Sequence, residues 1–293
     1  AVNEMYKEGN LSFLVGPLPS KYINRVRLLA DSREMPALVF PVSGDDREGG
    51  ANFIKFYYSL EDQVRTVSEY AARELGLRNF AILYPGNDYG ARMKEIFTRT
   101  ANSLGAQVVY EKAYDPETRD ITGELGWVEA AKPDAVFVAD GAESSARILL
   151  TLMHATDMRE VLFIGPSTWN SPVFFNLVGD DIDGFVYRTV FTDFFFYGSD
   201  EWSDFKARFE AKYERAPDFL GFEAYMAVKL LLSVSDGKKL TTTQLVNKIF
   251  SERDKLGYEI VKEANGSYRL SPGHKILSLE NGELRQIISV KNR

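Results

Sequence analysis

The feature that most constrains the fold of this chain is a repeated alternation of short apolar runs with longer stretches of helical period. The runs are rich in β-branched and aromatic residues, as in NFAILYP at 79–85 and DAVFVAD at 134–140. This alternation predicts an α/β fold in which helices cover a parallel sheet. The expected strands are 12–16, 37–41, 79–85, 106–114, 134–140, 161–166 and 184–191, and the expected helices are 20–34, 60–76, 88–104, 120–132 and 143–157.

Residues that begin and end helices support these assignments. Ser59 precedes Asp62 by three positions ahead of an apolar-periodic stretch, which is a capping arrangement for orphan helix N–H groups. Asp88 is interpreted in the same way, as the N-cap of the helix that follows the strand 79–85. Gly76 and Gly105 stand where a left-handed residue would close the preceding helix.

The alternation of apolar runs and helical stretches ends at about residue 192. Two helices, interrupted at Ala216-Pro217, and a third with Thr241 as its cap are expected between there and about residue 253. The last residues alternate in polarity and carry the turn signals Asn265-Gly266 and Asn281-Gly282, so they predict β-hairpins. No low-complexity linker occurs, and two domains would therefore be joined by direct crossings of the chain.

Composition excludes several classes of function. The 293 residues suffice for two domains, and the net charge of −7 argues against a nucleic-acid partner. With no cysteine, thiolate catalysis and zinc-thiolate sites are excluded. No apolar run is long enough to span a bilayer. The two histidines share no catalytic or metal-binding motif, and neither a P-loop nor GxGxxG is present, so no catalytic residue, metal or cofactor is expected.

Candidate site residues lie in the turns after the expected strands, at the sheet edge where open α/β proteins bind ligands. Ser20 and Ser43 could offer hydroxyl groups to a polar ligand, although serine is also an ordinary turn residue. Tyr89 could stack on a ligand and donate a hydrogen bond, or pack in the core. Trp169 falls in the polar turn IGPSTWNSP, where a large aromatic residue suggests a ligand face or interdomain packing.

Five segments of the chain are distinctive when taken together: VNEMYKEGNLSFLVGPLPS, RNFAILYPGNDYGARMKEIFTRTANSLGAQVVYEKAYDPETRDI, PDAVFVADGAESSARILL, FIGPSTWNSP and DFKARFEAKYERAPDFLGFEAYMAVKLLL. In this order they resemble the type I periplasmic-binding fold of the leucine/isoleucine/valine-binding family. Within that fold the chain looks closest to the branch of penicillin-binding protein activator lipoproteins. The similarity covers nearly the whole chain.

The resemblance implies two doubly wound, Rossmann-like lobes that are joined by three crossover strands and hold a ligand between them. Residues 1–58 and 192–272 would form one lobe, and residues 59–191 and 273–293 the other. The opening residues resemble the end of a helix that feeds the strand 12–16, with no strand before it. The first lobe is therefore expected to be incomplete at its N-terminus, which would leave a strand edge open to dimerisation.

Carried over residue by residue, the resemblance implies ligand contacts at Ser20, Val42, Ser43, Gly44, Tyr89, Gly141, Ala142 and Ser167. The chain departs from the amino-acid-binding members at two of these positions. Gly44 replaces a threonine that grips the ligand carboxylate, and Ser167 replaces an acidic residue that pairs with the ligand ammonium. Loss of that anion would cost on the order of several kcal/mol, which argues against a free α-amino acid as the ligand.

The function expected from the sequence is therefore an exported, non-enzymatic ligand-binding receptor of the ABC-transporter solute-binding type. Its partners would be a small polar ligand and a membrane permease. The alternative is a periplasmic lipoprotein that activates a penicillin-binding protein, a peptidoglycan synthase, through protein contact and no longer uses its cleft. A signal segment and a lipid anchor would lie upstream of this chain.

Overall fold

The chain forms two units, each built around its own β-sheet. The computed structural model describes residues 11–17, 20–40, 49–56, 59–117, 120–155, 158, 161–179, 188–193, 195, 197–256, 258–280 and 283–290. Unit 1 consists of Ala1–Tyr58 and Asp200–Gly273, and unit 2 consists of Ser59–Ser199 and His274–Lys291. The middle boundary falls between Ser199 and Asp200, later than the one expected near residue 192.

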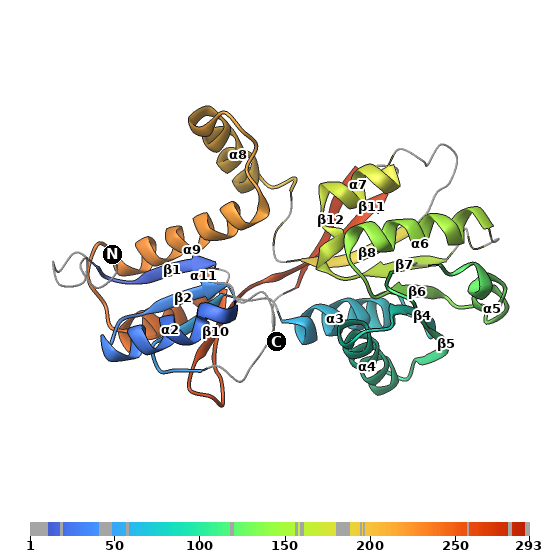
Figure 1. The fold of residues 1–293 in the computed structure, drawn as a ribbon, viewed down its shortest axis with the longest axis horizontal. Helices are drawn as coiled ribbons and strands as arrows, with labels where there is room; N and C mark the ends of the chain where they lie inside the picture. The colour runs from blue at the N-terminus through green and yellow to red at the C-terminus, as the bar shows by residue number, and fades with distance from the viewer. Residues whose placement is uncertain are drawn as a thin grey trace. The chain divides into compact units, whose positions relative to one another are not determined.

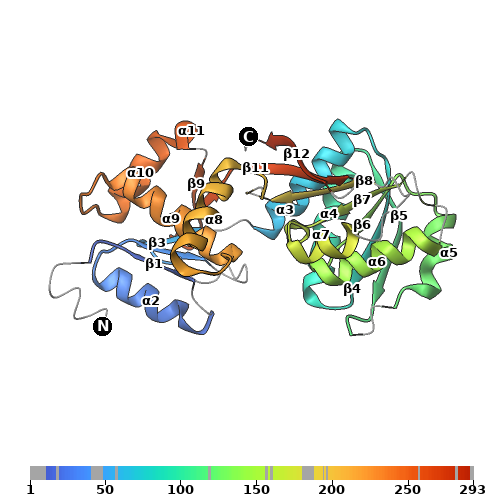
Figure 2. The ribbon, with the colours of Figure 1, turned by 90° about the horizontal axis from the view of Figure 1, so that it is seen from above.

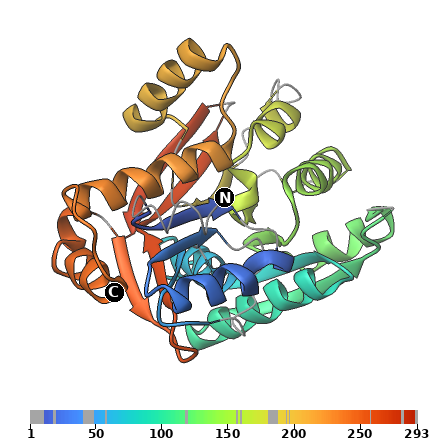
Figure 3. The same ribbon diagram turned by 60° about the vertical axis from the view of Figure 1, so that its left-hand side comes forward.

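Unit 1 contains, among the described residues, a five-stranded sheet in the order β1-β2-β3-β10-β9. The strands are β1 (Leu14–Pro17), β2 (Ala37–Phe40), β3 (Phe53–Phe56), β9 (Tyr258–Lys262) and β10 (Tyr268–Pro272). β1, β2, β3 and β10 run parallel, and β9 pairs antiparallel with β10. Figures 1 and 3 show α2 (Ser20–Ser32) and α9 (Phe219–Ser235) on opposite faces of this sheet.

Three further helices complete unit 1 within the described residues: α8 (Asp200–Tyr213), α10 (Thr242–Ser251) and α11 (Arg253–Leu256). The expected break between α8 and α9 is confirmed, as is the Thr241 cap. The Thr241 side chain accepts from the backbone N–H of Gln244, whose side chain accepts from the Thr241 N–H in return. This reciprocal capping box satisfies two orphan groups at the start of α10.

Unit 2 contains a seven-stranded sheet in the order β12-β11-β8-β7-β6-β4-β5, again counted over the described part of the chain. The strands are β4 (Asn79–Pro85), β5 (Gln107–Tyr114), β6 (Ala135–Val138), β7 (Leu162–Gly165), β8 (Arg188–Asp193), β11 (His274–Glu280) and β12 (Glu283–Val290). β4 to β8 are parallel, whereas β11 and β12 add antiparallel strands beyond β8 (Figure 2). The predicted α/β class with parallel sheets is thus confirmed.

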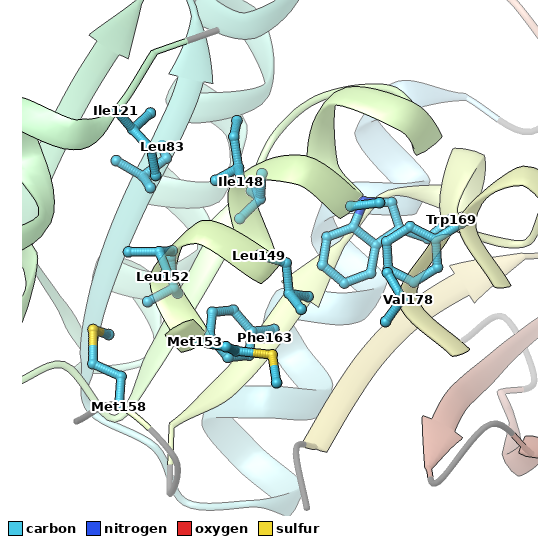
Figure 4. Packing of buried hydrophobic residues seen from close by; sticks show 14 of the residues in the cluster. Leu83, Ile121, Ile148, Leu149, Leu152, Met153, Met158, Phe163, Trp169 and Val178 are labelled. Carbon is cyan, nitrogen blue, oxygen red and sulfur yellow. The ribbon is translucent and has the colours of Figure 1, made fainter. Parts of the chain in front are cut away.

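Helices cover both faces of the unit 2 sheet (Figure 1). The helices α3 (Leu60–Glu69) and α4 (Asp88–Ser103) lie on one face, and α6 (Ala142–Ala155) and α7 (Pro172–Gly179) lie on the other. Alternate strand residues enter opposite cores, as β4 shows: Phe80 and Ile82 pack with α3 and α4, while Ala81 and Leu83 pack with α6 (Figure 4). Burial on both faces explains why these strands appear in the sequence as continuous apolar runs.

The expected helix boundaries around β4 are confirmed by backbone geometry. Ser59 Oγ accepts from the Asp62 N–H at 3.0 Å, which caps α3. Gly76 and Gly105 have φ values of +71° and +75°, so both adopt the left-handed conformation that glycine tolerates best. The end of α3 continues as a short π-helical turn, Tyr70–Glu74. Gly266, with φ of +88°, forms the expected turn between β9 and β10, and residues 281–282 lie outside the described part.

Three features of the fold differ from the sequence-based expectation. The strand β3 was missed because Lys55 interrupts its apolar pattern; the buried Lys55 ammonium is paired with Glu263 at 2.8 Å. The helix α7 was not among the expected helices. The expected helix 120–132 is shorter, with a 3₁₀ turn, Thr122–Glu124, followed by α5 (Leu125–Ala130). The described part of the strand expected at 184–191 is β8.

We predict that Gly105→Ala destabilises the protein by about 1 kcal/mol, because a Cβ is strained in the left-handed conformation even where space is free. Gly126→Ala is the matched control, since Gly126 lies in α5 with open space around it and no positive φ. Alanine is a better helix former, so this control is expected to be neutral or slightly stabilising. Urea unfolding of both variants checks the prediction. Equal effects of the two substitutions would contradict it.

Candidate ligand-binding edge of unit 2

Three loops of unit 2 meet at the carboxyl edge of its parallel strands. β6 lies between β4 and β7, with Leu83 opposite Val138 and Phe137 opposite Ile164, so the loops that follow these strands emerge side by side. We call Tyr89, Asp140, Gly141, Ser167 and Thr168 the carboxyl-edge cluster. The hydroxyl of Thr168 donates to the backbone carbonyl of Asp140 at 3.1 Å, which ties the β7 loop to the β6 loop.

The loop after β4 is fixed by Asn87 and not by Asp88. The Asn87 side-chain oxygen accepts from the Gly90 N–H at 3.0 Å, so Asn87 is the N-cap of α4. Asp88 is the first residue of the helix, where a carboxylate interacts favourably with the helix dipole. The prediction that Asp88 caps this helix is therefore wrong by one position. Gly90 packs so close to Pro85 that an added Cβ would lie 2.2 Å from the Pro85 carbonyl oxygen.

Tyr89 stands at the surface of the cluster, with 40% of its area exposed. Burial of its hydroxyl, and then the negative charge of Asp140, raise the pKa of Tyr89 to about 12. The exposed fraction describes the whole side chain, whereas the pKa reflects the surroundings of the oxygen. At neutral pH the hydroxyl is thus a proton donor beside a carboxylate. The expected role of Tyr89 in stacking on a ligand and donating a hydrogen bond to it stays a prediction.

Asp140 was not among the residues expected from the sequence. Its Oδ2 accepts from the Tyr114 hydroxyl at 2.6 Å, and its Oδ1 accepts from the Gly141 N–H at 2.7 Å. Its backbone carbonyl accepts from Ser145 Oγ at 3.0 Å. The sequence offered one signal, an acidic residue directly after a buried strand. That signal was interpreted as the end of the strand, because nothing local marks Tyr114 as its partner.

The expected contact residues Gly141 and Ala142 lie at the start of α6 and are half-buried. The Gly141 N–H is already occupied by Asp140, while the Gly141 carbonyl accepts from the Ser145 N–H. Ser167 begins the 3₁₀ turn after β7. Its hydroxyl and its N–H both donate to Gln63 Oε1, at 2.8 Å and 3.3 Å. Ser167 therefore carries no charge into the cluster and is held by α3.

Trp169 is a core residue, and the prediction of a ligand face at this position is wrong. It is fully buried, stacks on Phe174 at 4.5 Å between ring centroids and lies near Val178 (Figure 4). Gly165 makes room for the indole, since a Cβ there would lie 2.1 Å from the ring. The polar residues around Trp169 in the sequence suggested a surface position. Its aromatic neighbours Phe174 and Phe191 contact it only in the folded protein.

The remaining candidates belong to unit 1. Ser20 is the first residue of α2, which begins shortly after the end of β1. Val42, Ser43 and Gly44 lie outside the described residues, so the contacts expected there stay predictions. Of the nine expected residues, the structure thus brings Tyr89, Gly141, Ala142 and Ser167 to one edge and places Trp169 beneath it.

We predict that Trp169→Ala lowers the free energy of unfolding by about 3–5 kcal/mol, as truncation of a buried aromatic side chain does. Trp127→Ala is a matched control, because Trp127 is 68% exposed on α5 and should change stability by less than about 1 kcal/mol. Chemical denaturation followed by circular dichroism measures both effects. A ligand-facing Trp169 would instead give a stable variant that has lost only binding.

Raised tyrosine pKa values predict the response to alkali. Burial and nearby carboxylates raise the pKa of Tyr89, Tyr110 and Tyr197 to about 12, and burial also raises the pKa of Tyr258. The unfolded chain loses these protons near pH 10 while the native protein keeps them. The free energy of unfolding should therefore fall as the pH rises from about 10 through about 12. Urea titrations across this range test it, and a flat profile with all phenols ionising near pH 10 would contradict it.

Comparisons with known proteins identify the family. A family model described as periplasmic binding protein matches residues 1–249. Comparison with curated protein sequences found no match. Among the described residues, no helix combines the length and apolar character needed to cross a bilayer. The resemblance to penicillin-binding protein activators is tested by none of these findings.

Solved structures share the fold at low sequence identity. A branched chain amino acid ABC transporter periplasmic ligand-binding protein from Burkholderia xenovorans has a TM-score of 0.73 and 16% identity, covering 99% of this chain and 80% of that one. A branched chain amino acid ABC transporter protein from Thermus thermophilus with bound valine has a TM-score of 0.65 and 17% identity, covering 98% and 80%.

A third solved structure is the branched-chain amino acid transporter substrate binding protein from Streptococcus pneumoniae in complex with isoleucine. It has a TM-score of 0.65 and 15% identity, covering 99% of this chain and 82% of that one. At these identities the likeness shows the fold alone, while the family model spans most of the 293 residues. The chain therefore belongs to the periplasmic binding protein family and has its two-lobe type I fold.

Proposed function

We propose that this protein is a non-enzymatic solute-binding receptor of the ABC-transporter type, which binds a small polar ligand outside the cytoplasm. The observation that carries the proposal is the match of the periplasmic binding protein model to residues 1–249. The solved structures with bound valine and isoleucine make branched-chain amino acids the first ligands to test. The comparisons do not favour the alternative of a lipoprotein that activates a peptidoglycan synthase.

The carboxyl-edge cluster supplies the polar groups of unit 2 for such a ligand. Tyr89 offers a protonated hydroxyl at a partly exposed position, and Ala142 starts a helix whose first turn points its N–H groups toward that edge. These groups stand on a core that is buried on both faces of the sheet, so they are held in place before any ligand arrives. Such an arrangement suits binding and release of an unchanged solute.

The test is a thermal-shift screen with leucine, isoleucine, valine and other small carboxylic acids. A ligand that binds only the native protein stabilises it by about 2.7 kcal/mol at a hundred times its dissociation constant. We therefore expect a rise in melting temperature that grows with ligand concentration. Chemical analysis of the bound ligand after incubation should show it unchanged.

A pair of arginine variants locates the site. Ala142→Arg places a long cationic side chain in the carboxyl-edge cluster and should abolish the ligand-induced shift. Asn102→Arg, at an exposed position near the end of α4, is the control and should retain it. The proposal would be contradicted if no compound shifts the melting temperature of the wild type, or if both variants retain the shift.

A further inference from the structure

The negative charge of Asp140 is fixed at the carboxyl edge by neutral donors alone. The Tyr114 hydroxyl and the Gly141 N–H each bond one of the two carboxylate oxygens, at 2.6 Å and 2.7 Å. A carboxylate has about four acceptor positions, so these two bonds leave capacity for further donors. The side chain is half-buried, and its backbone is held by bonds from Ser145 and Thr168. The carboxylate thus has a defined position and unused acceptor capacity.

No basic side chain of the described residues neutralises Asp140 within ion-pair distance. The lysines of the neighbouring α4 and β5 are engaged elsewhere: Lys94 pairs with Glu111, and Lys112 pairs with Glu124. On α6, Arg147 pairs with Glu143 one turn along the helix. A partly buried carboxylate without a cationic partner carries a desolvation cost, which a cation on a bound molecule would offset.

The neighbours of Asp140 are suited to an organic cation more than to a metal ion. Tyr89 contributes a hydroxyl that remains protonated up to about pH 12. Ser167 and Thr168 add neutral hydroxyl groups that are bonded to Gln63 and to the Asp140 carbonyl. Within the described part of the chain, no group of three acidic or histidine side chains could hold a metal ion. A primary ammonium, with three donors, needs only one carboxylate and a few neutral acceptors.

We infer that Asp140 is the residue that binds a positively charged ammonium group of the ligand, with Tyr114 as the positioning residue that orients the carboxylate. This inference rests on the proposed function and names the ligand class, solutes that carry an ammonium group. The neutral Ser167 then does not exclude an amino acid as the ligand, because the anion is supplied from the neighbouring β6 loop. A charge-assisted bond of this kind discriminates strongly against ligands that lack the donor.

The test compares the wild type with Asp140→Asn by isothermal titration calorimetry. Asparagine removes the charge and keeps one side-chain oxygen for the Tyr114 hydroxyl, while its amide nitrogen cannot accept the bond from the Gly141 N–H. The probes are leucine, isoleucine and valine, together with 4-methylpentanoate, the counterpart of leucine without the amino group. Asp140→Asn should weaken binding of the amino acids by about 10- to 100-fold and leave binding of 4-methylpentanoate unchanged.

Two further variants serve as controls. Asp88→Asn removes an exposed carboxylate from the first turn of α4 and should bind the amino acids as the wild type does. Tyr114→Phe keeps the charge and loses the orienting hydroxyl, so it should weaken amino-acid binding by only a few-fold. If Asp140→Asn fails to fold, as judged by its melting curve, the inference depends on Tyr114→Phe weakening the amino acids and not 4-methylpentanoate.

The outcomes separate this inference from the proposed function. Wild-type affinity of Asp140→Asn for the amino acids would overturn the inference and leave the receptor function standing. Binding of 4-methylpentanoate but of no amino acid would do the same. Binding of none of these compounds by the wild type would overturn both. Selective loss of the amino acids in Asp140→Asn, with Asp88→Asn unaffected, is the result that we expect.

Discussion

The parallel hydrogen-bond ladder that joins β6 to β4 on one side and to β7 on the other is the interaction on which the candidate site depends. Parallel strands end at the same edge of a sheet, so this ladder brings together residues that lie far apart in the sequence. Tyr89, Asp140 and Ser167 become neighbours for this reason alone. The two apolar cores hold the strands in register, because a slip of one residue would move each buried side chain to the opposite face and disrupt the packing of both cores.

Side-chain hydrogen bonds then convert the strand ladder into a defined polar surface. Thr168 binds the Asp140 carbonyl, Tyr114 binds the Asp140 carboxylate, and Gln63 receives both donors of Ser167. Each bond links a different pair of elements, so the loops constrain one another. Trp169 anchors the β7 loop from below through its contact with Phe174. A ligand would meet groups whose conformational entropy has already been lost on folding, which favours affinity.

Sequence patterns predicted the elements whose information is local. The apolar run of β4, the Ser59 cap and the left-handed Gly76 depend on neighbouring residues, and each is confirmed. The strand β3 was not predicted, because Lys55 interrupts its apolar run. The ion pair that allows Lys55 to be buried is formed with Glu263, which is distant along the chain.

The same limit applies to the candidate site. The role of Asp140 depends on Tyr114, and the burial of Trp169 depends on the missing side chain of Gly165 and on stacking with Phe174. No window of sequence contains such contacts as a pattern. The prediction of Asp88 as the cap of α4 was wrong by only one position. Asn87 is the cap, and both residue types cap helices well.

The most direct measurement of the central claim is amide chemical-shift mapping by nuclear magnetic resonance, with labelled protein and increasing leucine. If unit 2 binds its ligand at the carboxyl edge, the amide signals of Tyr89, Gly141 and Ser167 shift in a saturable way. Those of Gly76 and Gly105, at the ends of the helices that lead back to the strands, should remain in place. Saturable shifts at Gly76 and Gly105, with Tyr89, Gly141 and Ser167 unchanged, would contradict the account.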